Sequence, residues 1–217
     1  MDKKSIWKIV TMIELIAATV VVLFDLFLPS LVILAMVIVS LLIRREGPAS
    51  LGFQRPESWS VLAIFSFLTA FLLQLFDVGV IMPIMNRVTG TTIQSSPDNL
   101  KGNPSQLILL IVLSWTLAAF CEEIAFRGYL PKLLTQLFGS GVLGLVLSVG
   151  ISSILFGLLH LEQGIIGVVV ATFDGLVFSW LKRKFNGNLW ATILAHGFYN
   201  TVGVLVFYFT GPIYGLW

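Results

Sequence analysis

Apolar residues dominate the chain in long runs, and the polar stretches that separate them are short. A helix needs about 20 residues to cross the hydrocarbon core of a bilayer. The pattern therefore predicts about seven transmembrane helices, within a range of about six to eight, at residues 7–28, 30–43, 59–82, 105–127, 142–160, 164–181 and 189–210. Two of these runs, 30–43 and 164–181, are short for a full crossing, so we expect them to be extended, tilted or partly inserted.

The composition supports the same fold class. The chain is 57% hydrophobic and 11% charged, whereas soluble domains carry about 25% charged residues. We therefore predict an all-α, polytopic integral membrane helical bundle that forms a single domain over residues 1–217. The formal net charge of +2 gives no indication of nucleic acid binding, and the single cysteine, Cys121, excludes an intrachain disulfide.

The first 43 residues are expected to form an N-terminal hairpin of two apolar segments, with its turn at Pro29. The basic start resembles a signal peptide. However, no small-x-small cleavage site follows and the apolar sequence continues to Ile43, which favours a retained anchor.

The lysines and arginines predict an orientation. If the N-terminus is cytoplasmic and seven segments alternate, 11 of the 13 basic residues lie inside. The two outside are Arg87 and Lys101; those inside are Lys3, Lys4, Lys8, Arg44, Arg45, Arg55, Arg127, Lys132, Lys182, Arg183 and Lys184.

Two adjacent glutamates, Glu122 and Glu123, stand near the end of an apolar run. A charge at the bilayer centre costs about 2.5–3.5 kcal/mol on insertion scales, so such residues face a bundle interior, pair or react. Glu123 and Arg127 have the spacing of a helical ion pair, which leaves Glu122 as the better candidate for chemistry. The alternative is that both glutamates are interfacial.

Both histidines of the chain also lie in or beside apolar runs. His160 follows Phe156 by four residues, and Thr192, His196 and Asn200 form a polar stripe at the same spacing. A backbone hydrogen bond would explain His160 alone, and hydrogen bonds between helices would explain the stripe. Three stripe residues favour a polar cavity.

The remaining charged and reactive residues have simpler interpretations. Glu14, Asp25 and Asp77 are expected at interfaces or in helix pairing, whereas Asp174, in the middle of a segment, is a candidate for the same cavity. Cys121 is expected to be an inert packed thiol, because its surroundings are apolar and lack a basic neighbour.

This set of residues suffices for amide hydrolysis. A carboxylate and a histidine can activate a water, and a second histidine with an asparagine can donate hydrogen bonds to an oxyanion. Glu122, His160 and His196 are equally suited to bind a catalytic zinc, although the chain lacks the H-E-x-x-H helix.

Three short motifs occur in a fixed order: Glu122-Glu123-x-x-x-Arg127, Phe156-x-x-x-His160 and His196-x-x-x-Asn200. The chain thereby resembles the CPBP, or Abi, family of intramembrane endopeptidases, which contains CAAX prenyl proteases and bacteriocin-processing enzymes. The flanking residues agree: Phe126-Arg127-Gly128, Leu51-Gly52-Phe53 and Asn188-Leu189-Trp190. The resemblance covers about residues 50–205.

The resemblance implies an endopeptidase in which Glu122 and His160 activate water and His196 and Asn200 form the oxyanion hole. Glu123 and Arg127 would support the site. A metal-free mechanism is favoured, and zinc is the alternative cofactor. The expected partners are membrane lipids and a membrane-associated protein or peptide substrate, cleaved at a site that opens toward the cytoplasmic side of a cell membrane, expected to be a bacterial plasma membrane. The resemblance does not imply a prenylated substrate.

Two other functions fit the sequence. The same fold can serve a non-proteolytic membrane module, such as a bacteriocin immunity or scaffold protein. A transporter that uses Glu122 and Asp174 as a proton relay is disfavoured, because the chain has no internal repeat.

One geometric conflict follows from the predicted segments. Glu122 and His196 lie near the inner ends of their segments, but strict alternation places His160 at an outer end, about 20 Å away at 1.5 Å per residue. The motifs require these residues to meet. We therefore expect a bent or tilted segment at 142–160, or a re-entrant piece around 129–150.

Overall fold

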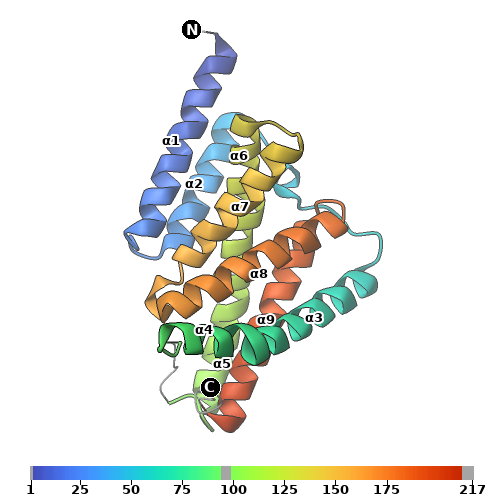
Figure 1. Ribbon diagram of the computed structural model, residues 1–217. Helices are drawn as coiled ribbons and strands as arrows, with labels where there is room; N and C mark the ends of the chain where they lie inside the picture. The colour runs from blue at the N-terminus through green and yellow to red at the C-terminus, as the bar shows by residue number, and fades with distance from the viewer. Residues whose placement is uncertain (1, 94–98, 212–217) are drawn as a thin grey trace.

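The computed structural model describes residues 2–93 and 99–211, and over these residues the chain is helical without strands (Figure 1). The α-helices are α1 (Lys3–Leu23), α2 (Pro29–Arg44), α3 (Trp59–Phe76), α4 (Met82–Thr89), α5 (Pro104–Leu113), α6 (Leu130–Phe138), α7 (Val142–Leu158), α8 (Gly164–Lys184) and α9 (Leu189–Thr210). Short 3₁₀ turns, η1 (Pro48–Leu51) and η5 (Leu161–Gln163), lie in two of the connections.

Two long rods contain π-helical segments. In the first rod, η2 (Asp77–Ile81) joins α3 to α4; in the second, η3 (Ser114–Glu122) and η4 (Ile124–Tyr129) join α5 to α6. π-Helix is rare in proteins and is frequent at functional sites. The second rod therefore brings an unusual backbone to the two glutamates.

The second rod runs without a break from Pro104 to Phe138. The prediction that this segment ends at residue 127 is wrong, because α6 is amphipathic. Leu130, Leu133 and Leu134 are buried, so polar residues on the other face lower the hydropathy without ending the helix. The glutamates accordingly lie in the middle of a rod.

Seven helical rods correspond to the seven predicted segments. Five of those within the described residues are long and apolar enough to cross a membrane: Ser5–Leu23, Trp59–Thr89, Pro104–Phe138, Leu161–Lys184 and Leu189–Thr210. The other two, α2 and α7, are apolar but shorter, with 16 and 17 residues. The prediction of an all-α, polytopic membrane bundle is confirmed.

The rods alternate in direction, and the rod from α5 to α6 packs against α1, α2, α7 and α9 (Figure 1). α7 packs on α8, α3 on α9, and η3 against both α9 and α2. Both ends of α9 carry residues that are typical of helix ends. The Asn188 side chain caps the start by accepting a hydrogen bond from the Trp190 N–H at 3.0 Å, and Gly211 follows the end.

Candidate active site

The flanking residues of the three motifs form one joint at the end of the bundle. The Leu189 N–H donates to the Gly52 carbonyl at 2.8 Å. The Lys182 ammonium donates to the Leu51 carbonyl at 2.9 Å and to the Arg127 carbonyl at 2.8 Å. A side chain on Gly52 would stand 2.3 Å from a backbone oxygen, and its φ is +104°, so this position requires glycine. The joint fixes the motif-bearing helices relative to one another.

The predicted ion pair of the glutamate motif is confirmed. Arg127 Nη1 donates to Glu123 Oε1 at 2.9 Å, and both side chains are buried. The guanidinium carbon also lies 3.9 Å from the centre of the Phe156 ring and 5.3 Å from that of Phe178. Aromatic faces attract a cation, so these rings stabilise Arg127 where water is excluded.

Glu123 also contacts His196, one of the predicted catalytic residues. The sequence did not predict this contact. Its Oε1 lies 2.8 Å from Nδ1 of His196. Because an ionised carboxylate only accepts hydrogen bonds, Nδ1 carries the hydrogen, and Nε2 is the ring nitrogen left for other partners. Glu123 thus orients His196 as well as pairing with Arg127.

His160 is oriented by its own helix. Its Nδ1 lies 2.9 Å from the Phe156 carbonyl oxygen, and its ring packs edge-on against the Phe156 ring at 4.8 Å. A carbonyl oxygen accepts only, so Nδ1 is the protonated nitrogen and Nε2 has the basic lone pair. The bond to the Phe156 carbonyl is the backbone hydrogen bond that the sequence suggested for His160. It also leaves Nε2 free to accept a proton.

His160, His196 and Asn200 line one cavity of about 120 Å³. Asp174 lies in the same wall, as the sequence suggested, and so does Tyr199, which the sequence did not indicate. Thr192, the third residue of the predicted stripe, does not line the cavity but lies beside Glu123. Thr192 is buried, and its hydroxyl donates to the Leu189 carbonyl at 3.0 Å.

Glu122 is placed differently from the other predicted site residues. It does not line the cavity; its Oε1 accepts a hydrogen bond from Ser30 Oγ of α2 at 3.2 Å. Its Oε2 is buried and has no partner among the described residues, and the carboxyl group interacts electrostatically with His196. The predicted role of Glu122 in water activation stays a prediction.

The structure explains how His160 reaches the other motifs. α7 is short and runs obliquely, and its turn into α8 lies well above the lower ends of α5 and α9 in Figure 1. The expected tilt at 142–160 is thus confirmed. The expected re-entrant piece around 129–150 is wrong, since α6 continues the long rod and only residues 139–141 form the turn into α7.

A second carboxyl group lies close to the cavity. The Tyr199 hydroxyl donates to Asp77 Oδ2 at 2.8 Å, which confirms Asp77 as a helix-pairing residue. Asp77 is fully buried in η2, because the π-helical turn directs this residue of the first rod toward α9. Only the position of Asp77 within an apolar run could have indicated this from the sequence.

The described residues do not fit a metal site. None of them form a group of three or more histidine, cysteine, aspartate or glutamate side chains that could hold a metal ion. Glu123, not Glu122, is the carboxylate on His196. Cys121 is buried and its Sγ donates to the Thr116 carbonyl at 3.1 Å, as expected of a packed thiol.

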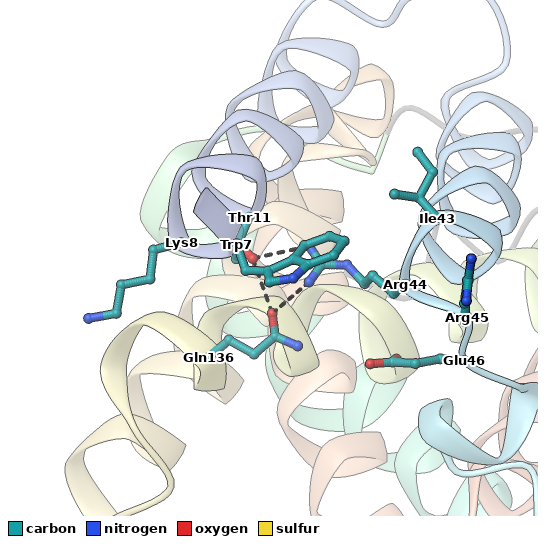
Figure 2. A pocket seen from close by; sticks show the side chains of 8 residues that line it. All are labelled: Trp7, Lys8, Thr11, Ile43, Arg44, Arg45, Glu46 and Gln136. Atoms are coloured by element: carbon teal, nitrogen blue, oxygen red, sulfur yellow. Dashed lines mark hydrogen bonds between the residues drawn. The ribbon is translucent and has the colours of Figure 1, made fainter. Parts of the chain in front are cut away.

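A larger cavity, of about 700 Å³, lies elsewhere, between the ends of α1, α2 and α6 (Figure 2). Its lining contains no residue proposed for catalysis: Trp7, Lys8, Thr11, Ile43, Arg44, Arg45, Glu46 and Gln136. Arg44 bridges the gap between the helices there, with hydrogen bonds to Thr11 and Gln136 (Figure 2). The larger cavity therefore contains none of the predicted site residues.

The fold is that of a polytopic membrane protein, and comparison with known proteins adds to this. Residues 104–202 match the family model of type II CAAX prenyl endopeptidase Rce1-like proteins. This stretch contains all three motifs, so the predicted family resemblance is confirmed over these residues.

A protein of Mycoplasma capricolum subsp. capricolum, described as an uncharacterized protein, is 34% identical to the chain over 101 residues. The alignment covers 46% of this chain and 28% of that protein, so the match spans little more than a quarter of the relative. No solved structure matches the chain.

Proposed function

We propose that the protein is an intramembrane endopeptidase that hydrolyses a peptide bond of a membrane-associated protein or peptide. The observation that carries this proposal is the cavity inside the bundle, lined by His160, His196 and Asn200. His160 lies in the turn after α7, and His196 and Asn200 lie on α9, so the chain brings a base and hydrogen-bond donors into one small space. The match to an endopeptidase family supports the same reaction class.

In the proposed reaction, His160 and Glu122 activate the water. The water oxygen attacks the carbonyl carbon while its proton passes to Nε2 of His160, the nitrogen that the Phe156 bond leaves basic. When the C–N bond breaks, this proton moves to the leaving amine nitrogen. Glu122 is assigned to the same step because its Oε2 is buried without a partner.

His196 and Asn200 are proposed to stabilise the oxyanion. Because Nδ1 of His196 already donates to Glu123, donation from Nε2 requires a hydrogen on both ring nitrogens. The Asn200 amide supplies a neutral donor. Arg127 in turn balances the charge of Glu123.

The substrate class and the setting complete the proposal. The site lies within a membrane bundle, so the scissile bond belongs to a chain that is embedded in or held at the membrane. We propose a bacterial plasma membrane, with the N-terminus cytoplasmic and the site opening to the cytoplasmic side, because 10 of the 13 basic residues, all but Arg87, Lys101 and the buried Arg127, then lie on that side.

The test compares membranes that contain wild-type protein with membranes that contain His160→Gln or Glu122→Gln, by identification of new peptide N-termini. We expect each substitution to lower cleavage at least about 100-fold while thermal unfolding stays near that of the wild type. The matched control is Asp25→Asn. Asp25 lies in the turn between α1 and α2, so this variant should cleave normally.

Two outcomes would overturn parts of the proposal. Unchanged cleavage by His160→Gln would exclude the reaction, and a cellular role retained by both variants would favour a non-proteolytic immunity or scaffold module. Loss of cleavage in Glu123→Gln but not in Glu122→Gln would move the catalytic role to the carboxylate that contacts His196.

A further inference from the structure

The catalytic cavity has an acidic wall that the proposed reaction does not use. Asp174 and Tyr199 line this wall, and Asp77 stands behind it. The carboxyl groups of Asp77 and Asp174 lie within hydrogen-bonding reach of each other. Asp77 is 0% exposed and Asp174 is 5% exposed, so neither is solvated as a surface carboxylate would be.

This acidic wall lacks hydrogen-bond donors. The Tyr199 hydroxyl gives its one hydrogen to Asp77 Oδ2. The Oδ1 atoms of Asp77 and Asp174 are both buried and receive no hydrogen bond from any described residue. A buried polar atom without a partner costs about 1–3 kcal/mol, and more when it is charged, so the unpartnered oxygen of Asp174 in the cavity wall, with that of Asp77 behind it, points to a missing donor.

The acidic wall also lacks a close positive charge. Arg127 interacts with Asp174 electrostatically, but its hydrogen bond goes to Glu123 and its guanidinium faces are covered by aromatic rings. Two carboxyl groups in contact repel each other when both are ionised, so they are stabilised either by a shared proton or by a cation.

We propose that Asp77, Asp174 and Tyr199 form an acidic subsite that binds a positively charged group of the substrate, a primary ammonium or a guanidinium, beside the scissile bond. The inference rests on the proposed function, because it uses the same cavity. An ammonium carries three donors and a guanidinium five, which matches the two unpartnered oxygens. Met82 and Val170 line the same cavity and offer apolar contacts to the stem of a lysine or arginine.

The first test needs no substrate. Thermal unfolding of the purified protein is measured with n-butylammonium and with n-butanol, which has the same stem and a neutral head. We expect n-butylammonium to raise the unfolding midpoint of the wild type by a few degrees more than n-butanol does, because it supplies the missing donors and charge.

The variants for this test keep the shape of the side chains. Asp174→Asn and Asp77→Asn should each abolish the difference between the two compounds, whereas Asp25→Asn should keep it. An equal response of wild type and Asp174→Asn to the two compounds would overturn the proposal, since water or a shared proton would then suffice.

The second test uses a cleaved peptide identified in the membrane comparison. We expect a lysine or arginine within a few residues of the cleavage site, and replacement of that lysine by norleucine should lower kcat/KM about tenfold in wild type and leave Asp174→Asn unchanged. If wild type cleaves peptides that lack any basic residue equally well, the subsite assignment fails while the protease assignment stands. If no peptide is cleaved, the thermal test still decides the subsite.

Discussion

The described residues contain two arginine–glutamate pairs, one between two helices and one within a single helical rod, and the pairs differ in what surrounds them. Arg44 at the end of α2 pairs with Glu14 in the middle of α1, whereas Arg127 and Glu123 pair within the long rod from α5 to α6. The side chains of the first pair are 7% and 16% exposed, those of the second 1% and 0%.

The partners of the two arginines show what each pair does. Besides Glu14, the Arg44 guanidinium donates to Ser40, Thr11 and Gln136, so oxygens on three helices hold it. Arg127 has one carboxylate and aromatic faces, and its Nη2 has no hydrogen-bond partner among the described residues. The first pair connects α1 to α2, and the second places its carboxylate against His196.

The largest effect is expected from breaking the inner pair. Arg127→Gln leaves Glu123 buried without its counter-charge, and removal of one partner from a buried pair costs about 3–5 kcal/mol. The unfolding free energy in detergent, measured by denaturant titration, should fall by that amount. A loss below about 1 kcal/mol would show that His196 alone can balance Glu123.

A smaller effect is expected from the packing that brings His160 to this pair. A side chain on Gly157 would lie 1.9 Å from Thr172 Oγ1 and 2.6 Å from the Val168 carbonyl, so Gly157→Ala should push α7 away from α8. We expect a loss of about 3 kcal/mol, at the upper end for overpacking, together with reduced cleavage.

Gly150 of the same helix is the matched control for Gly157. No atom lies within 4 Å of a side chain built on it, so Gly150→Ala should be neutral or slightly stabilising. Equal unfolding midpoints for the two variants would contradict the close contact between α7 and α8.

The smallest effect is expected at the outer pair. Arg44→Gln loses an ion pair that is partly exposed, while glutamine can keep part of the hydrogen bonding, so the unfolding free energy should fall by about 1 kcal/mol. Cleavage should be unchanged, because Arg44 does not line the cavity of His160, His196 and Asn200. A large loss of cleavage in this variant would mean that the hairpin controls the site.

Much of the fold followed from the sequence because lipid restricts the chain to a few structures. Backbone groups in a membrane must be paired internally, so long apolar runs have to be helices, and their number was read correctly. Helical spacing predicted the Glu123–Arg127 pair. The spacing of His196 and Asn200 predicted that both side chains face one polar cavity.

The rest depended on contacts that no local pattern specifies. The π-helical segments depend on backbone geometry that the sequence pattern does not reveal. Two hydrogen bonds, from Ser30 to Glu122 and from Tyr199 to Asp77, join helices that are far apart in sequence. The end of the long rod was missed because α6 turns a polar face outward. Hydropathy averages over such a face and reports a helix end where there is none.

The short α7 has a consequence for the bilayer itself. Its 17 residues span about 25 Å, less than the hydrocarbon thickness of about 30 Å, and its oblique course shortens the depth further. A hydrophobic segment shorter than the membrane draws the lipid surfaces together around it. We expect this hydrophobic mismatch to thin the bilayer beside α7, whose end lies next to His160.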